Sequence, residues 1–94
     1  MTQVKTKTTR KRVTFHLEAQ PGSDVYIAGD FNDWDPSARR MKDPDKSGNY
    51  STTMLLPRGE YQYKFVIDGH WSIDPNCEEW IPNEMGSLNS VLKI

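Results

Sequence analysis

The chain lacks several features that whole classes of protein require. Its 94 residues contain one cysteine, Cys77, so no internal disulfide bond can form. No apolar run is long enough to span a membrane, and no apolar stretch of a secretion signal lies near the start. Lysine and arginine total 12 and aspartate and glutamate 13, and the net charge of −1 creates no overall field for nucleic acid or an anionic membrane. These absences predict a cytoplasmic protein, or a module of a larger one, that binds neither.

Sequence signatures of catalysis, metal binding and phosphate binding are also missing. The two histidines, His16 and His70, form no His-x-x-x-His motif, and no Cys-x-x-Cys pair exists. No serine lies in a Gly-x-Ser-x-Gly turn, and no glycine-rich loop leads into a helix. Most aspartates fall in turns, where their side chains bond the backbone. We therefore expect no catalytic residue, no metal site and no cofactor, and a binding protein rather than an enzyme.

Helical periodicity is absent as well, and a period of two is present in its place. Val13, Phe15 and Leu17 alternate with polar residues, as in a strand with one buried face. Short strands separated by turns predict an all-β antiparallel sandwich of about seven strands. The basic residues gather at the front, where we expect a flexible segment at 1–12, followed by the folded module at 13–94. Strands are expected over 12–19, 25–29, 49–56, 60–67, 70–72 and 88–94, with a short edge strand near Met41.

The dipeptide Asp68–Gly69 is typical of a two-residue hairpin turn, because glycine readily adopts positive φ. Such a turn places Val66 opposite Trp71, and residues that lie opposite one another share a face of the sheet. Because side chains alternate along a strand, Trp71 then lies on the side of Lys64 and away from Tyr63. An indole beside an ammonium group suits a sugar, whose C–H face stacks on the ring and whose hydroxyls accept from lysine.

The stretch AGDFNDWDP, residues 28–36, places Trp34 among turn-forming residues. Loops lie on the surface, although tryptophan is highly buried on average. We expect Phe31, which closely follows a strand, to fold back under the loop and plug the core. Trp34 then stays exposed in the free protein, where it can meet Trp71 across a binding platform.

Three stretches together resemble carbohydrate-binding module family 48, namely VYIAGDFNDW, GNYSTTMLLPRGEYQYKFVIDGHWSIDP and NEMGSLNSVLKI. The likeness runs from Val13 to Ile94. That family includes the glycogen-binding module of the AMP-activated protein kinase β subunit and N-terminal modules of isoamylases, pullulanases and glycogen branching enzymes. The resemblance implies an immunoglobulin-like (early set) sandwich. It also implies non-catalytic binding of α-1,4-linked glucans such as glycogen, starch or maltooligosaccharides.

The resemblance further implies which residues bind the carbohydrate. Two tryptophans would stack on glucose rings, a lysine and an asparagine would bond hydroxyls, and a loop would add an apolar and a hydroxyl residue. By motif these residues are Trp34, Trp71, Lys64, Asn89, Met85 and Ser87. The kinase-type module has leucine and threonine where this chain has Met85 and Ser87. Methionine is more flexible than leucine and serine keeps the hydroxyl, so we expect a change in affinity and not in the site's identity.

Trp80 has no counterpart in the kinase-type loop. It either caps the core or extends the platform, and the average burial of tryptophan favours packing.

Other functions stay open. The module could serve a kinase or an amylolytic enzyme through protein interactions that no longer depend on sugar. It could also be a fragment of an amylolytic enzyme with a fused catalytic domain. A start at methionine and an end on a strand also fit a free-standing protein.

Overall fold

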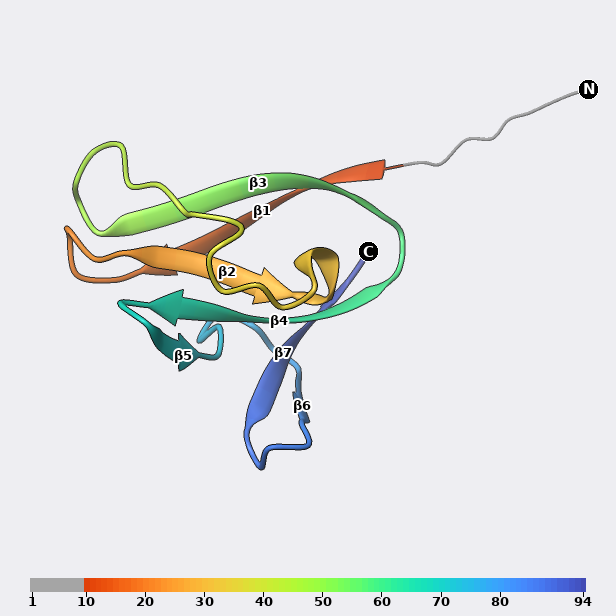
Figure 1. Ribbon diagram of the computed structural model, residues 1–94. Coiled ribbons are helices and arrows are strands. Elements are labelled where there is room, and N and C mark those ends of the chain that lie inside the picture. The colour runs from red at the N-terminus through yellow and green to blue at the C-terminus, as the bar shows by residue number, and fades with distance from the viewer. Residues whose placement is uncertain (1–9) are drawn as a thin grey trace, which may run out of the picture.

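Two antiparallel sheets face each other in the computed structural model, which describes residues 10–94 (Figure 1). One sheet contains β1 and β3, and the other contains β2, β4, β5, β6 and β7. The predicted all-β sandwich is confirmed. The elements are β1 (Arg10–Glu18), β2 (Val25–Gly29), the 3-10 turn η1 (Asp30–Asn32), β3 (Asn49–Pro57), β4 (Glu60–Ile67), β5 (His70–Ser72), β6 (Trp80–Pro82) and β7 (Leu88–Lys93).

Strand β4 is the centre of the larger sheet. Strand β2 pairs along one of its edges, from Val25 opposite Ile67 to Gly29 opposite Tyr63. The other edge is shared, because β7 pairs with the first half of β4 and β5 pairs with the second half. Strand β6 extends the sheet beyond β7. This arrangement leaves one face of β2, β4, β5 and β7 turned away from the smaller sheet.

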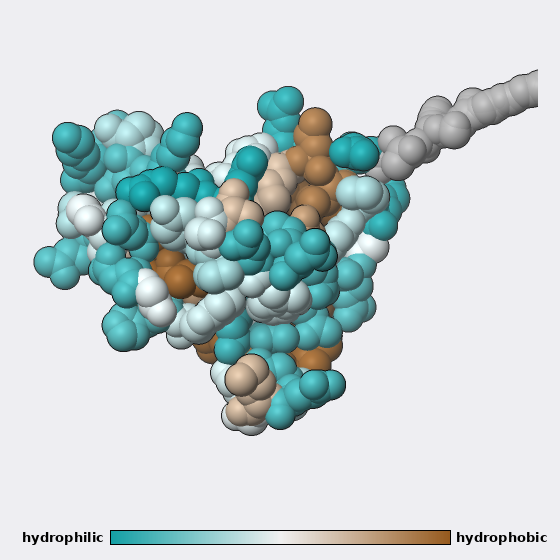
Figure 2. Space-filling model, viewed as in Figure 1, coloured by the Kyte–Doolittle hydropathy of each residue, from teal (hydrophilic) through white to brown (hydrophobic). Residues whose placement is uncertain are grey.

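The core lies between the sheets and follows the predicted period of two. Phe15 and Leu17 come from β1, Ile27 from β2, and Tyr63 and Phe65 from β4, and all five are buried. The face in Figure 2 is mostly hydrophilic, with hydrophobic residues visible only as small separate areas. Alternation therefore identified the buried face of each long strand correctly.

Three local features differ from the sequence-based expectation. Strand β6 lies in what we expected to be a loop, and so does η1. Three residues that include a proline are too few to show an alternating pattern. The edge strand near Met41 is a pair of isolated bridges, in which 40 and 42 pair with Tyr26 and Ser51 and Met41 is buried between them.

The basic N-terminal segment, which we expected at 1–12, overlaps the first strand. Residues 10–12 belong to β1, while residues 1–9 lie outside the described residues. Within residues 10–94, no helix has the length and apolar character needed to cross a bilayer.

A buried tyrosine–carboxylate pair joins β4 to the segment after β5. The Tyr63 hydroxyl donates to Asp74 Oδ2 at 2.7 Å, and Asp74 also accepts from the backbone N–H of Asn76 at 2.9 Å. Burial raises the pKa of the Tyr63 phenol far above its usual range, and the hydrogen bond and negative charge of Asp74 raise it further. The neutral phenol is therefore the form that the folded state stabilises.

This pair predicts alkaline instability. The unfolded chain ionises tyrosine near pH 10, whereas folded Tyr63 stays neutral, so its contribution to stability is full below about pH 10 and is lost as the pH rises further. Spectrophotometric titration should show that Tyr63 ionises only as the protein unfolds. A Tyr63→Phe variant should lose roughly 1–3 kcal/mol of stability at neutral pH, because Asp74 loses a buried donor. Ionisation of Tyr63 in the folded protein near pH 10 would contradict this.

Candidate functional site

Two tryptophans meet on the outward face of the larger sheet. The ring centroids of Trp34 and Trp71 lie 6.4 Å apart, with their planes inclined by 38°. Trp71 lies on β5, opposite Val66 of β4 as the hairpin turn predicted, and is 47% exposed. Trp34, which we expected to be exposed, is half-buried, but it does not belong to the core cluster. The pair therefore forms an aromatic surface that solvent can reach.

The backbone that holds Trp34 is unusual. Asp33 and Trp34 both have positive φ, 57° and 59°, which is costly for residues other than glycine. The Asn32 side chain holds the turn in place, because Oδ1 accepts from Gly29 N–H at 3.0 Å and Nδ2 donates to Ile27 C=O at 3.0 Å. Backbone N–H of Trp34 also donates to the Gly29 carbonyl at 2.9 Å. Such strain persists only where the surroundings fix it, and it commonly marks a functional loop.

Phe31 packs inward from the same turn. Its ring lies 5.8 Å from that of Phe15 and 6.2 Å from that of Tyr61, and it packs against the core cluster. The predicted plug is confirmed. One residue of the turn therefore anchors it inside, and Trp34, three residues later, is directed to the outer face.

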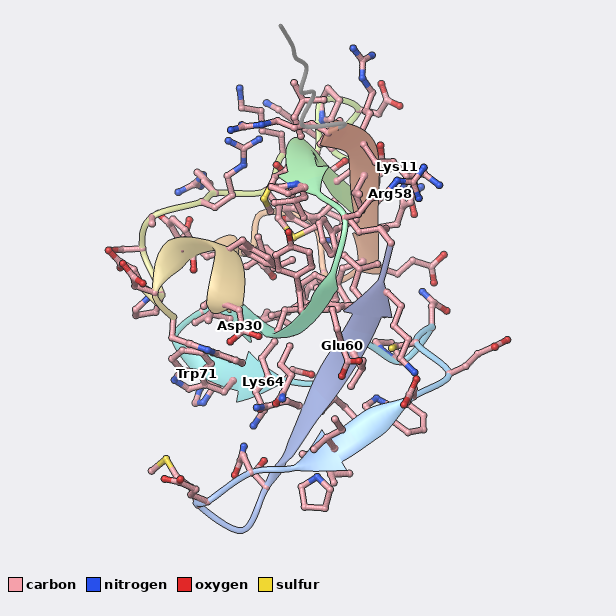
Figure 3. All side chains as sticks on the ribbon, turned by 90° about the vertical axis from the view of Figure 1, so that its right-hand side faces the viewer. Lys11, Asp30, Arg58, Glu60, Lys64 and Trp71 are labelled. Carbon is pink, nitrogen blue, oxygen red and sulfur yellow. The ribbon has the colours of Figure 1, made fainter. Side chains whose placement is uncertain are left out.

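Asp30 fixes the orientation of the Trp34 indole. Trp34 Nε1 donates to Asp30 Oδ1 at 2.9 Å, and the backbone N–H of Gln62 on β4 donates to Asp30 Oδ2 at 2.8 Å. One carboxylate thus ties the ring to the central strand. Figure 3 shows Trp71 and Lys64 beside each other, with Asp30 close above them.

Lys64 and Asn89 lie on the same outward face, in the middle of the sheet. Lys64 Nζ donates to Ser87 Oγ at 2.7 Å, while Asn89 Nδ2 donates to Gln62 Oε1 at 2.9 Å. Both Lys64 and Asn89 are 8% exposed, so their side chains lie along the sheet and are fixed by these contacts. Polar groups that are held in place before a ligand arrives lose little entropy on binding.

The loop between β6 and β7 carries Met85 and Ser87. Asn83 Oδ1 accepts from the backbone N–H groups of both residues, at 2.9 and 3.0 Å. Asn83 Nδ2 donates to Asn89 Oδ1 at 3.0 Å, which joins the loop to the sheet. Met85 itself is 91% exposed. The loop backbone is therefore ordered, while the methionine side chain projects freely into solvent.

One hydrogen-bonded network connects five of the six sequence-predicted residues with three that sequence reasoning did not single out. It runs from Trp34 through Asp30, Gln62, Asn89 and Asn83 to Met85 and Ser87, and from Ser87 to Lys64. Trp71 joins through its ring contact with Trp34. Asp30, Gln62 and Asn83 were missed because turn and strand positions explain their residue types without a binding role.

Trp80 lies away from the platform, and its exposure does not support the packing role that the average burial of tryptophan favoured. It is 39% exposed and is not among the residues packed on the core. Its register partner Ser90 pairs in turn with Tyr63, a core residue, so Trp80 lies on the face opposite Lys64. It extends neither the core nor the platform.

The site is an open surface and not a deep cleft. A hollow of about 610 Å³ lies elsewhere, lined by residues 21–23, 40–44, 46 and 50, and includes neither Trp34 nor Trp71. No group of three or more potential metal ligands occurs among residues 10–94. An aromatic surface fixed by a polar network defines a recognition module of the carbohydrate-binding type.

The comparison with known families supplies the more specific identification. The chain belongs to the family described as the glycogen recognition site of AMP-activated protein kinase, which matches residues 12–94. It is 33% identical to the β-1 subunit of 5'-AMP-activated protein kinase from Sus scrofa over 73 residues, which are 78% of this chain and 56% of that protein. It is 31% identical to the human β-2 subunit over 87 residues, 93% of this chain and 30% of that one. The chain therefore spans about half of the pig protein and less than a third of the human one.

Proposed function

We propose that this chain binds α-1,4-linked glucans, such as glycogen, starch or maltooligosaccharides, on the platform formed by Trp34, Trp71, Lys64, Asn89, Met85 and Ser87. The single observation that supports this most is the pair of indoles 6.4 Å apart on the outward face, one of them fixed by a carboxylate. Large aromatic faces gain most from apolar contact with the C–H face of a sugar ring.

The inclination of the two indoles favours a curved glucan. Successive glucose rings in an α-1,4 chain turn relative to one another, whereas β-1,4 linkages keep them nearly coplanar. Two indole planes inclined by 38° match rings that turn. We therefore expect α-1,4 oligosaccharides to bind and cello-oligosaccharides of the same length not to.

Lys64, Ser87 and Asn89 supply the polar contacts. An ammonium group has three donors, and Lys64 uses one of them on Ser87. The serine hydroxyl can both donate and accept, and the Asn89 amide has a second N–H beyond the one given to Gln62. These groups would bond the hydroxyl rim of a glucose unit, while the exposed Met85 side chain would pack against its apolar parts.

Titration with maltoheptaose tests the proposal. In NMR spectra, the indole Nε1–H signals of Trp34 and Trp71 should shift at millimolar maltoheptaose, and the signal of Trp80 should not. Cellohexaose is the negative control. A folded sample whose Trp34 and Trp71 signals stay unchanged throughout would overturn the proposed function.

Removing the ammonium group of Lys64 should weaken binding while preserving the fold. Lys64→Met keeps the aliphatic stem that lies along the sheet, so only the charged donor is lost, at a cost of roughly 10- to 100-fold in affinity. Lys11→Met makes the same charge change on the other sheet and should bind as the wild type does. Isothermal titration calorimetry of both variants against maltoheptaose measures the difference, and equal affinities would contradict the role of Lys64.

The cellular setting is a further part of the proposal. The matched relatives are named as kinase subunits, so we propose that this module acts within, or beside, a regulatory subunit of a kinase in the cytoplasm. The alternative is a protein-interaction or regulatory module of a kinase or amylolytic enzyme that no longer depends on sugar binding. Under that alternative, a Trp34→Ala variant would keep its partner while wild-type protein fails to bind glycogen.

A further inference from the structure

A second polar cluster lies on the outward face of the sheet, beside the tryptophan pair. Tyr26 of β2 is opposite Val66 of β4, which is opposite Trp71 of β5, so the three side chains form one row across the face. Val66 is only 5% exposed although it points away from the core. Such burial is expected when a large aromatic side chain flanks it on each side. Tyr26 thus continues the aromatic surface past the known pair.

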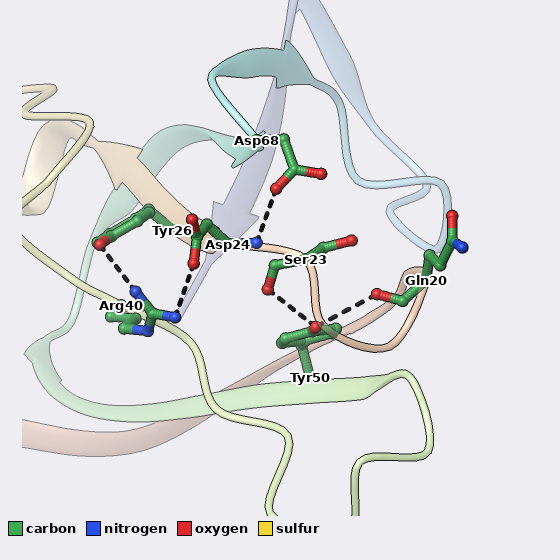
Figure 4. A network of polar contacts seen from close by, with 7 residues as sticks. All are labelled: Gln20, Ser23, Asp24, Tyr26, Arg40, Tyr50 and Asp68. Carbon is green, nitrogen blue, oxygen red and sulfur yellow. Dashed lines mark hydrogen bonds and ion pairs between the residues drawn. The ribbon is translucent and has the colours of Figure 1, made fainter.

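Tyr26 is fixed by charged neighbours. Arg40 Nη1 donates to the Tyr26 hydroxyl at 3.1 Å, and Arg40 Nη2 donates to Asp24 Oδ1 at 2.8 Å (Figure 4). The backbone N–H of Asp24 donates to Asp68 Oδ1 at 2.8 Å, which ties this cluster to the β4–β5 turn. Arg40 also forms a backbone bridge with Tyr26. The cluster is thus ordered, although the side chains of Arg40 and Asp24 remain 54% and 64% exposed.

The chemistry of this cluster suits sugar hydroxyls. A guanidinium group has five N–H donors in one plane, and the contacts above use two of them. A carboxylate has two oxygens, and Asp24 gives one to Arg40. Planar donors and acceptors beside an aromatic ring can bond adjacent hydroxyls of a sugar whose C–H face lies on that ring.

We propose that Tyr26, Arg40 and Asp24 form an additional α-glucan subsite, which extends the Trp34–Trp71 platform across β2. This inference rests on the proposed function. Tyr26 and Trp71 are two strands apart, about 10 Å at the backbone. A short oligosaccharide centred on the tryptophans leaves the subsite empty, and a longer chain fills it. The module then binds long chains more tightly than short ones.

The test measures how variants of two neighbouring arginines bind a short and a long oligosaccharide. Arg40→Gln removes the guanidinium of the subsite. Arg39→Gln is the matched control, because it makes the same charge change and Arg39 donates instead to Thr52 Oγ1 and the Thr53 carbonyl on β3. The affinities of both variants and wild type are measured for maltotriose and maltoheptaose by calorimetry. Thermal unfolding should show both variants folded, since exposed ion pairs contribute little.

Wild type and Arg39→Gln should bind maltoheptaose more tightly than maltotriose. In Arg40→Gln, the affinity for maltoheptaose should fall about fivefold, while the affinity for maltotriose stays unchanged. On the wild-type protein, the side-chain Nε–H signal of Arg40 should shift with maltoheptaose and not with maltotriose. An unchanged preference together with a static Arg40 signal overturns the subsite and leaves the proposed function standing. If neither sugar moves the Trp34 and Trp71 signals, the proposed function fails, and the subsite fails with it.

Discussion

Replacing Trp34 with alanine should lower the affinity for glycogen and maltoheptaose by at least about 30-fold, since truncating a central aromatic contact typically costs 2 kcal/mol or more. Trp34 is outside the core cluster, so the protein should remain folded. In the Trp34→Ala variant, alanine must adopt the unfavourable positive φ of 59° that Trp34 has. A Trp34→Gly variant avoids this cost, because glycine adopts positive φ readily. Both variants should lose binding, which assigns the loss to the indole and not to the backbone.

Trp80→Ala is the matched control for this prediction. Trp80 is an indole that is 39% exposed and lies on the opposite face of the same sheet. Its removal should leave glycogen pull-down and the maltoheptaose affinity unchanged. If the Trp34 and Trp80 variants lose glycogen binding equally, nonspecific adsorption through accessible indoles, and not the platform, accounts for retention on glycogen.

Replacing Gly29 with alanine should damage both the fold and the site. A Cβ at this position would lie 2.5 Å from the Gln62 carbonyl oxygen, 2.8 Å from Tyr63 Cβ and 3.0 Å from Phe31 Cζ. Two of these atoms belong to the backbone or lie next to it on β4, so β2 and β4 must separate. We expect a loss of about 1–3 kcal/mol, or more than 4 °C in Tm for a domain of this size. Sugar affinity should fall as well, because the Gly29 carbonyl accepts from Trp34 N–H.

Gly22→Ala distinguishes the effect of steric crowding around a Cβ atom from the cost of a left-handed backbone conformation. Gly22 has a φ of +90°, but a Cβ there would meet nothing within 4 Å. This variant should lose about 1 kcal/mol from the left-handed conformation alone and keep its full affinity for maltoheptaose. A Gly29 variant as stable as wild type would contradict the close packing of β2 on β4.

The register of the β4–β5 hairpin could be predicted because it depends on local chemistry. Asp68 and Gly69 both have positive φ, as the two-residue turn requires, and Val66 is opposite Trp71. A one-residue slip would have moved Trp71 to the other face. The two turn residues were therefore enough to place Trp71 and Lys64 together on the outward face.

Other contacts in the site could not be predicted from the sequence. The bond from Trp34 to Asp30 is local, yet it requires a 3-10 turn and two positive φ values that no sequence pattern indicated. The contacts of Gln62 with Asn89 and of Asn83 with Asn89 join separate strands and a loop. Their residue types are ordinary in turns and on sheet surfaces. Only the folded chain shows that they support the binding face.

The sequence by itself determined the all-β class, the inward face of each long strand, the inward position of Phe31 and the outward position of Trp71. Each of these follows from alternation or turn chemistry over a few residues. The tertiary structure alone decided the distance and inclination between the Trp34 and Trp71 rings, the contact of Lys64 with Ser87, and the position of Trp80 on the opposite face. These contacts join residues 10 to 37 positions apart, and their geometry depends on how strands pair and how loops cross the sheet. Residue types over a short window carry no information about such distances.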